Sequence, residues 1–296
     1  MKKGIFYIVA ASCIFGAMPS ANKYVMLSGI SAEAVAFWGQ LTICALSYLL
    51  IRLCRASIHI KVQNMFCLLA VGAVGMGATT FLVNKACLYI SAGLATVLHF
   101  LYPTIVSLTM ILFFGKKAGK PTYAAILCSV VGMVFIAGQQ DSSGGGNLIG
   151  VLFALASSLT YSFYVVANDK GSFNDYPLMV KLFYSSMGSS LLVGALCLTT
   201  GGLARPAGAE VSLVLFGVCG IGSMAAYYLI IAGIRQIGAG MAAFFNMLEP
   251  IASVIISALL YKDHITLGVM CGIALVLLSV LFAAIGERGS TDTPQQ

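Results

Sequence analysis

Four polar side chains occupy matching positions in two similar apolar stretches of this 296-residue chain. His99 and Tyr102 lie in the first stretch, and Asn246 and Glu249 hold the corresponding positions 147 residues later. The members of each pair are three residues apart, so both side chains fall on one face of a helix. Imidazole and carboxyl groups exchange protons, and a carboxylate can hold the ammonium group of a solute. These residue types at this spacing therefore favour proton transfer or solute binding.

Glu249 has the highest free-energy cost of placement in a bilayer among these side chains, because it lies near the middle of its apolar stretch. An ionised carboxylate at the centre of a bilayer costs at least about 2.5–3.5 kcal/mol, so Glu249 needs a partner or a water-filled cavity. Burial disfavours the charged form of a carboxyl group, which allows proton uptake near neutral pH. The alternative is a structural carboxyl group held by hydrogen bonds between helices. His99 is either part of the same chemistry or a packed hydrogen-bond donor.

Further aromatic and amide side chains fall on helix faces that could line the same cavity. Tyr161, Tyr164 and Asn168 follow one face, at spacings of three and four residues. Rings with polar tips suit amphipathic organic ligands, although they also anchor helices at membrane interfaces. The complete set predicted to line the cavity is Glu249, His99, Tyr102, Asn246, Tyr161, Tyr164, Trp38, Gln40, Asn22 and Asn168.

Three prolines fall inside the apolar stretches, at Pro19, Pro103 and Pro250. Each removes a backbone hydrogen bond, so each predicts a kink in its helix. Pro103 and Pro250 are 147 residues apart and belong to the repeated segment. Carbonyl groups freed at such kinks could bind solute or act as hinges, and a plain packing kink is the alternative.

The composition indicates an integral membrane protein. Hydrophobic residues make up 60% of the chain and charged residues only 8%, whereas a soluble domain carries about 25% charged residues. The net charge of +7 comes from basic residues scattered singly between apolar runs, so no nucleic-acid partner is expected. The nine cysteines form no C-x-x-C pair and are interpreted as small packing residues. No metal and no cofactor is predicted.

A membrane helix needs about 20 apolar residues, and the chain contains ten such stretches. We therefore predict an all-α integral membrane protein with ten transmembrane helices. The predicted spans are 4–25, 33–53, 64–86, 92–114, 121–138, 147–168, 177–199, 211–232, 239–261 and 265–286.

The spans divide into two similar halves of five. Because five is odd, the second half enters the membrane from the opposite side, and the halves are predicted to be inverted repeats. The glycine-rich third and eighth spans match as well, and their glycines predict close helix packing. These glycines are Gly72, Gly75 and Gly77 in the first half and Gly217, Gly220 and Gly222 in the second. The predicted organisation is a first repeat at 1–140, a linker at 141–146, a second repeat at 147–286 and a short cytoplasmic tail at 287–296.

The positions of Lys and Arg predict the orientation, because basic residues are enriched on the cytoplasmic side. With the N-terminus in the cytoplasm, only four of the 16 basic residues face outward, namely Lys23, Lys85, Arg205 and Lys262. Both termini are therefore predicted to be cytoplasmic, in a multi-pass protein of the cell's inner (plasma) membrane.

With these features the chain resembles the drug/metabolite transporter superfamily, specifically its ten-helix EamA-type branch. The resemblance covers the whole chain. It rests on the five-plus-five arrangement, the glycine-rich spans, the run Ile90–Ala95 with Tyr102-Pro103, and the run Ile237–Ala242 with Leu248-Glu249-Pro250. It implies secondary transport of small organic solutes, often amino acids or other metabolites, and often export.

The chain departs from its relatives at two kinds of position. Many relatives have a glutamate after the fourth and ninth spans, where this chain has 115–117 (Gly-Lys-Lys) and 261–263 (Tyr-Lys-Asp). Many also have an arginine in the second span, where this chain has Trp38-Gly39-Gln40. An anionic substrate is therefore less expected here.

The leading hypothesis is a proton- or gradient-coupled secondary transporter that works by alternating access, with the lipid bilayer and a small-molecule solute as partners. Export of amino acids or related amphipathic compounds is the favoured activity. An integral-membrane enzyme, a channel and a non-transporting membrane sensor are the alternatives. The oligomeric state stays open, and a monomer is compatible with two halves in one chain.

Overall fold

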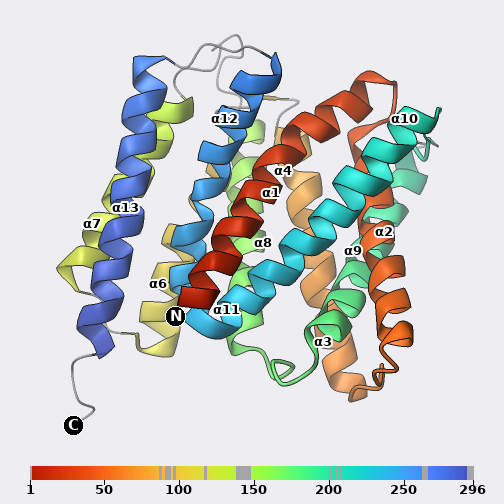
Figure 1. The fold of residues 1–296 in the computed structure, drawn as a ribbon, viewed down its shortest axis with the longest axis horizontal. Coiled ribbons are helices and arrows are strands. Elements are labelled where there is room, and N and C mark those ends of the chain that lie inside the picture. Colours follow the sequence, from red (N-terminus) through yellow and green to blue (C-terminus); the bar gives the residue numbers. More distant parts are fainter. Residues whose placement is uncertain are drawn as a thin grey trace.

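The computed structural model describes residues 2–86, 89–90, 95, 98–116, 119–137, 148–200, 202–204, 206, 208–261 and 266–291. Helices account for nearly all of this part of the chain (Figure 1). The predicted linker at 141–146 lies outside the described residues.

The helices follow the predicted apolar stretches along the chain. Those of the first half are α1 (Lys2–Leu27), α2 (Ala32–Leu53), α3 (Val62–Gly72), the π-helix η1 (Ala73–Ala78), α4 (Thr79–Ala86), α6 (Tyr102–Phe114) and α7 (Lys120–Ala137). Those of the second half are α8 (Leu148–Lys170), α9 (Leu178–Thr200), α10 (Ala209–Ser212), the π-helix η2 (Leu213–Gly222), α11 (Ser223–Asn246), α12 (Leu248–Tyr261) and α13 (Leu267–Thr291). The last helix continues five residues beyond the predicted end of its span, into the predicted tail.

Within the described residues, 6 helical stretches are long and apolar enough to cross a membrane. They are Lys2–Leu27, Ala32–Leu53, Val62–Ala86, Leu148–Lys170, Leu178–Thr199 and Ala209–Asn246. Shorter apolar helices occupy Tyr102–Phe114, Lys120–Phe135 and Met270–Ala283. The protein is thus an all-helical membrane protein, and the count of ten crossings stays a prediction.

Helices of one half pack mainly against helices of the other half. In the first half, α1 contacts α11 and α12, and in the second half α8 contacts α4 and α6 in the equivalent way. Two further pairs join equivalent helices directly, because α2 packs on α9 and α7 packs on α13. The α7–α13 pair forms one end of the molecule, whereas α2, α3 and α9 form the other (Figure 1). Two copies of one unit related by a two-fold axis would give this pattern of contacts.

Glycines allow the closest of these helix contacts. A Cβ atom on Gly72 would lie 1.7 Å from the carbonyl oxygen of Ser185 in α9, and one on Gly75 would lie 2.6 Å from Cβ of Tyr164 in α8. Gly222, in the equivalent π-helix, meets Met18 of α1 at 3.0 Å.

Gly77 and Gly220 also pack closely against a neighbouring helix, at Ser189 and Thr42 respectively. The predicted packing role is therefore confirmed for these positions. It is wrong for Gly217, whose nearest neighbour is Leu213, one turn earlier in the same helix.

The predicted fourth and ninth spans are not continuous helices. Phe100 and Leu101 form a turn before α6, and Met247 forms a turn between α11 and α12. Pro103 is thus the second residue of α6 and Pro250 the third residue of α12, where an N–H group has no intrahelical partner to lose. The structure therefore replaces the two predicted kinks by two breaks at equivalent places. At Pro19, α1 continues without a break.

A further break separates the predicted eighth and ninth spans. Gly238 has φ 75° and ψ 164°, a conformation that favours glycine, whereas its neighbours in α11 are helical. The residues Ala239–Asn246 therefore form a short helical segment between the breaks at Gly238 and Met247. This segment carries Asn246 at its end and α12 carries Glu249 in its first turn.

Candidate functional site

Asn246 is the centre of a polar network that joins the two halves, in which Tyr102 and Asn246 are buried and Glu249 is half-buried. Its Nδ2 group donates to the Tyr102 hydroxyl at 2.9 Å and to Oε2 of Glu249 at 3.1 Å. Tyr102 is fully buried and Asn246 is 3% exposed. Tyr102 begins α6 and Glu249 follows the break before α12, so the network links the two equivalent breaks directly.

Ser12 of α1 orients the Asn246 amide. The Ser12 hydroxyl lies 3.1 Å from Oδ1 of Asn246 and 2.8 Å from the carbonyl oxygen of Ile8. Since a hydroxyl donates only one proton, it serves one of these acceptors at a time. With Oδ1 turned toward Ser12, both N–H groups of Asn246 point to Tyr102 and Glu249.

His99 is not among the hydrogen-bonded members of this network and instead contacts a serine of α8. Its Nδ1 atom lies 3.0 Å from the hydroxyl of Ser157 in α8. Its ring packs against Tyr102 and Tyr161, with centroid distances of 5.8 Å and 5.5 Å. His99 and Asn246 hold equivalent positions, and each meets a serine of the long helix beside it. The structure therefore joins Tyr102, Asn246 and Glu249 by hydrogen bonds, whereas His99 contacts Tyr102 only through its ring.

A row of aromatic rings leads away from Tyr102. The centroid of Tyr161 lies 4.7 Å from that of Tyr102, Tyr164 lies 6.0 Å beyond it, and Tyr227 of α11 lies a further 5.9 Å along. Phe15 of α1 ends the row, 4.9 Å from Tyr227. The row crosses the middle of the helix bundle, because its members come from α6, α8, α11 and α1.

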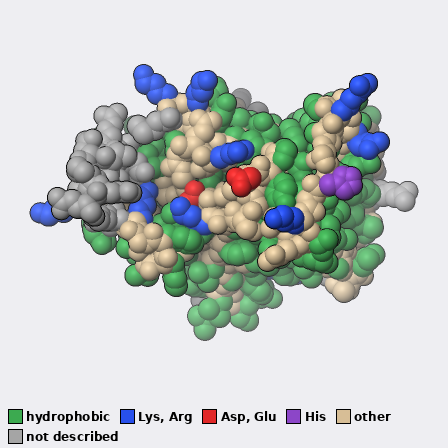
Figure 2. All heavy atoms as spheres, turned by 90° about the horizontal axis from the view of Figure 1, so that it is seen from below, with side chains coloured by type: hydrophobic (Ala, Val, Ile, Leu, Met, Phe, Trp, Pro, Cys, Tyr) green, Lys and Arg blue, Asp and Glu red, His purple; other side chains and the backbone are tan. Residues whose placement is uncertain are grey.

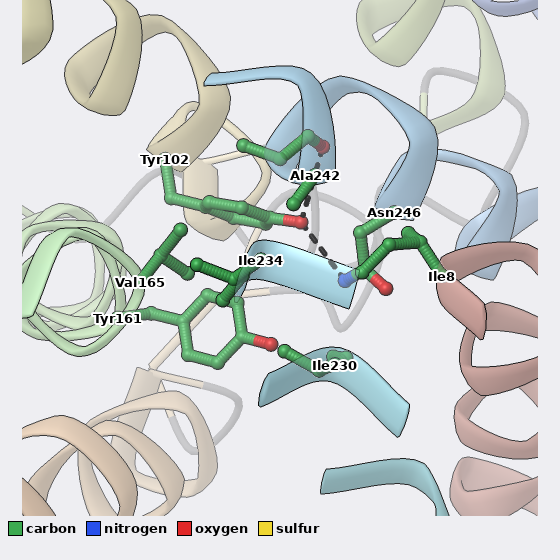
Figure 3. A pocket seen from close by; sticks show the side chains of 9 residues that line it. Ile8, Tyr102, Tyr161, Val165, Ile230, Ile234, Ala242 and Asn246 are labelled. Atoms are coloured by element: carbon green, nitrogen blue, oxygen red, sulfur yellow. Dashed lines mark hydrogen bonds between the residues drawn. The ribbon is translucent and has the colours of Figure 1, made fainter. Parts of the chain in front are cut away.

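A small cavity lies beside the start of this row (Figure 3). Its walls come from α1, α6, α8 and α11, and the Tyr102 hydroxyl and the Asn246 amide point toward one another at its edge. Its volume is about 10 Å³, which is room for about one water molecule. The lining residues are Ile8, Tyr102, Tyr161, Val165, Ile230, Ile234, Ala242, Ala243 and Asn246. Mostly apolar walls with three polar side chains, here Tyr102, Tyr161 and Asn246, are typical of a solute site, but the cavity in this conformation is too small for an organic solute.

The other predicted residues lie elsewhere. Trp38 was predicted to line the cavity, but its Nε1 group donates to the carbonyl oxygen of Ala204 at 3.0 Å and its ring packs on Phe216. The loop after α9 thus holds Trp38 near the start of α2. Asn168 is buried and donates to the Tyr164 carbonyl oxygen of its own helix. Asn22 is half-buried near the end of α1.

Gln40 is buried beside the far end of the aromatic row. It is 7% exposed, and its side chain is a hydrogen-bond neighbour of the Tyr227 hydroxyl. Gln40 and Tyr227 face each other from α2 and α11, which brings a helix of each half to this place.

Sequence reasoning missed several residues that complete the site. Ser12 and Ser157 fix Asn246 and His99, and Ser162 donates to the carbonyl oxygen of Tyr102 at 3.2 Å. The recurrence of Ser12 as Ser158, at the spacing of 146 that relates α1 to α8, is the signal that could have indicated a polar position on α1.

Charge is distributed unequally between the two ends of the molecule. Figure 2 shows the end at which α1 begins, where Lys and Arg side chains are spread over the surface and acidic side chains are few. Among them are the exposed Lys2 and Lys3, which begin α1. At the opposite end, Lys85 pairs with Glu33 at 3.7 Å. Within the described residues, no cluster of three His, Cys, Asp or Glu side chains is arranged to hold a metal ion.

Comparisons with known sequences match transporters in both cases. A family model described as the EamA-like transporter family matches twice, at residues 2–138 and 148–285. A curated protein of Salmonella typhimurium strain LT2, described as the uncharacterized inner membrane transporter YicL, is 26% identical over 206 residues. That match covers 67% of this chain and 66% of the relative, so the chain spans about two thirds of the relative's length.

One solved crystal structure, described only as that of a protein, shares the fold. Its TM-score is 0.81 at 15% sequence identity, over 95% of this chain and 98% of the other.

Proposed function

This chain belongs to the EamA-like transporter family, and we propose that it is a secondary active transporter of small organic metabolites that works by alternating access. The observation that carries the proposal is the hydrogen-bonded network of the buried Tyr102 and Asn246 with the half-buried Glu249. A carboxyl group in the middle of an apolar bundle is costly, and apolar side chains would pack the same helices without that cost. Family membership favours transport over an integral-membrane enzyme or a channel.

Alternating access requires that each end of the solute path can open in turn. On one side, α1 packs on α11 at glycine contacts, because a Cβ atom on Gly233 would lie 2.4 Å from Cδ1 of Ile8. On the other, α8 packs on η1 and α4 in the equivalent way, at Gly75. We propose that the halves are inverted repeats, so these two contacts face opposite sides of the membrane. Exchange of conformation between the halves would then open one contact while closing the other.

Glu249 is the proposed coupling group. In its charged form it accepts a hydrogen bond from Asn246 and can hold a solute ammonium group. In its protonated form it no longer attracts a cation. Competition between a proton and a solute for one carboxyl group couples their movements in opposite directions. An inward proton gradient can then drive export of the solute.

The cavity walls indicate the substrate class. No Lys or Arg is among the residues that line the cavity, and bidentate Arg or Lys contacts are the usual recognition of phosphates and dicarboxylates. We therefore propose a neutral, zwitterionic or cationic solute, with an amino acid or its derivative favoured over sugar phosphates and nucleotide sugars. The cavity must enlarge to admit it, which parting of α1 from α11 would allow.

The proposed setting is the inner membrane, with both termini in the cytoplasm. The basic end shown in Figure 2 would then face the cytoplasm. Purified protein in liposomes tests the function directly, with labelled amino acids, amines and sugar phosphates offered with and without a pH gradient. Gradient-dependent accumulation of an amino acid or amine is the expected result. Accumulation of a sugar phosphate alone would contradict the substrate class, and transport of none of these solutes would contradict the proposed function.

A further inference from the structure

Two buried oxygen atoms near the middle of the bundle have no hydrogen-bond partner among the described residues. They are Oε1 of Gln40 and the hydroxyl oxygen of Tyr164. Gln40 is 7% exposed and Tyr164 is fully buried. Most buried polar side-chain atoms in proteins are hydrogen bonded, so two unpartnered groups in one region need an explanation, and a ligand that supplies the missing hydrogen bonds is one.

Tyr227 brings these two groups into one cluster. Its ring centroid lies 5.9 Å from that of Tyr164, and its hydroxyl lies within hydrogen-bonding reach of the Gln40 side chain. The three side chains come from α8, α11 and α2, so the cluster lies between helices of both halves. Gln40 contributes an acceptor to this cluster and Tyr164 contributes a hydroxyl that can donate.

The remaining unpartnered buried oxygens are of a different kind. They are the hydroxyl groups of Ser47, Thr104 and Ser189. A serine or threonine hydroxyl in a helix can rotate to bond a carbonyl oxygen of the preceding turn. The Gln40 carbonyl oxygen accepts only, and a tyrosine hydroxyl is too far from its own backbone for such a bond, so neither group has this local alternative.

The aromatic row connects this cluster to Glu249. From Tyr164 the row passes to Tyr161 at 6.0 Å and on to Tyr102 at 4.7 Å. Tyr102 then joins Glu249 through Asn246. Polar groups therefore stand at both ends of an aromatic surface, with a carboxyl group at one end and a neutral donor–acceptor pair at the other.

We propose that Gln40 and Tyr164 form a second polar subsite, which binds a hydroxyl or amide group at the far end of a solute whose ammonium group lies at Glu249. The solute group donates to Oε1 of Gln40 and accepts from the Tyr164 hydroxyl. The aromatic row covers the apolar part between the two ends. The solute class is thus an amine with a neutral hydrogen-bonding group at its other end. This inference rests on the proposed function.

Tyramine and phenethylamine form a matched pair of probes, because they differ only in the phenol hydroxyl. Dissociation constants for both are measured by calorimetry on the full chain in detergent micelles. We expect tyramine to bind at least about tenfold more tightly, which corresponds to about 1.4 kcal/mol. Tyr164→Phe and Gln40→Leu should each bring this ratio close to one and leave the affinity for phenethylamine unchanged.

Two controls separate this proposal from the proposed function. Tyr184→Phe removes a hydroxyl that bonds the Ile58 carbonyl oxygen, away from the cluster, and should leave the ratio unchanged. Glu249→Gln should weaken both amines equally. Equal binding of the two amines by the parent protein, or a parental ratio in Tyr164→Phe, would overturn the second subsite alone. Failure of the parent to bind either amine at millimolar concentration would also overturn the second subsite, whereas the proposed function fails only if the liposome assay shows no transport of any amino acid or amine.

Discussion

Replacement of Asn246 by leucine tests whether the network holds the two halves together. Asn246 donates two hydrogen bonds, one to the Tyr102 hydroxyl and one to Glu249. Loss of a bond to a neutral group costs about 0.5–1.5 kcal/mol, and loss of a bond to a charged group about 1.5–3 kcal/mol. Bonds between membrane helices average lower, at about 0.6 kcal/mol. The lower membrane values bring the expected cost of Asn246→Leu to about 1–3 kcal/mol of the free energy of unfolding.

Asn168→Leu is the matched control. Asn168 is as buried as Asn246, at 2% against 3% exposed, but its amide group donates to a carbonyl oxygen of its own helix. Its replacement should cost about 0.5–1.5 kcal/mol, the value for one neutral bond. Equilibrium unfolding of the purified variants in mixed micelles measures both changes.

A double-mutant cycle identifies the partner. In a Glu249→Gln background, Asn246→Leu should cost less by about 1 kcal/mol or more, because the bond to Glu249 is no longer made to a charged acceptor. Equal costs for Asn246→Leu and Asn168→Leu, or a cost of Asn246→Leu that Glu249→Gln leaves unchanged, would refute the role given to this network.

Two further predictions concern packing and topology. Gly72→Ala should lower the melting temperature and the yield of folded protein, because its Cβ atom would lie 1.7 Å from the Ser185 carbonyl oxygen. Gly39→Ala is the control and should be neutral or stabilising, because no heavy atom lies within 4 Å of its Cβ position. Thermal unfolding compares the two variants, and tolerance of Gly72→Ala would contradict the close packing of α3 on α9. In a cysteine-free background, an impermeant thiol reagent should label Ser57→Cys only from the cytoplasm and Leu203→Cys only from outside, and labelling of both from one side would contradict the proposed orientation.

The helices were predictable from the sequence because the apolar stretches are long and the two halves repeat at a nearly constant spacing. The breaks at Leu101 and Met247 were not, since the apolar pattern runs through both without interruption. The prolines that follow were interpreted as kinks within a continuous helix. Proline is equally compatible with the first turn of a new helix, and only the packing of the halves decides between the two.

The centre of the site was partly predictable. The repeat placed Tyr102, Asn246 and Glu249 on equivalent faces, and the structure joins them by hydrogen bonds. The spacing of residues along a helix cannot tell which neighbour a face will meet. For that reason Trp38 was assigned to the cavity, although the Ala204 carbonyl oxygen and Phe216 hold it elsewhere.

Proton coupling through Glu249 is the central claim, and solute-driven proton movement in liposomes tests it most directly. Liposomes that contain a pH-sensitive dye are prepared with the parent protein and with Glu249→Gln, which keeps the size of the side chain but cannot titrate. Amino acids and tyramine are added, and internal pH and solute content are followed together between about pH 6 and pH 8. The account predicts coupled proton movement and accumulation by the parent, and only uncoupled exchange by Glu249→Gln. Accumulation by Glu249→Gln at the parental level across this range would show that Glu249 is a structural carboxyl group.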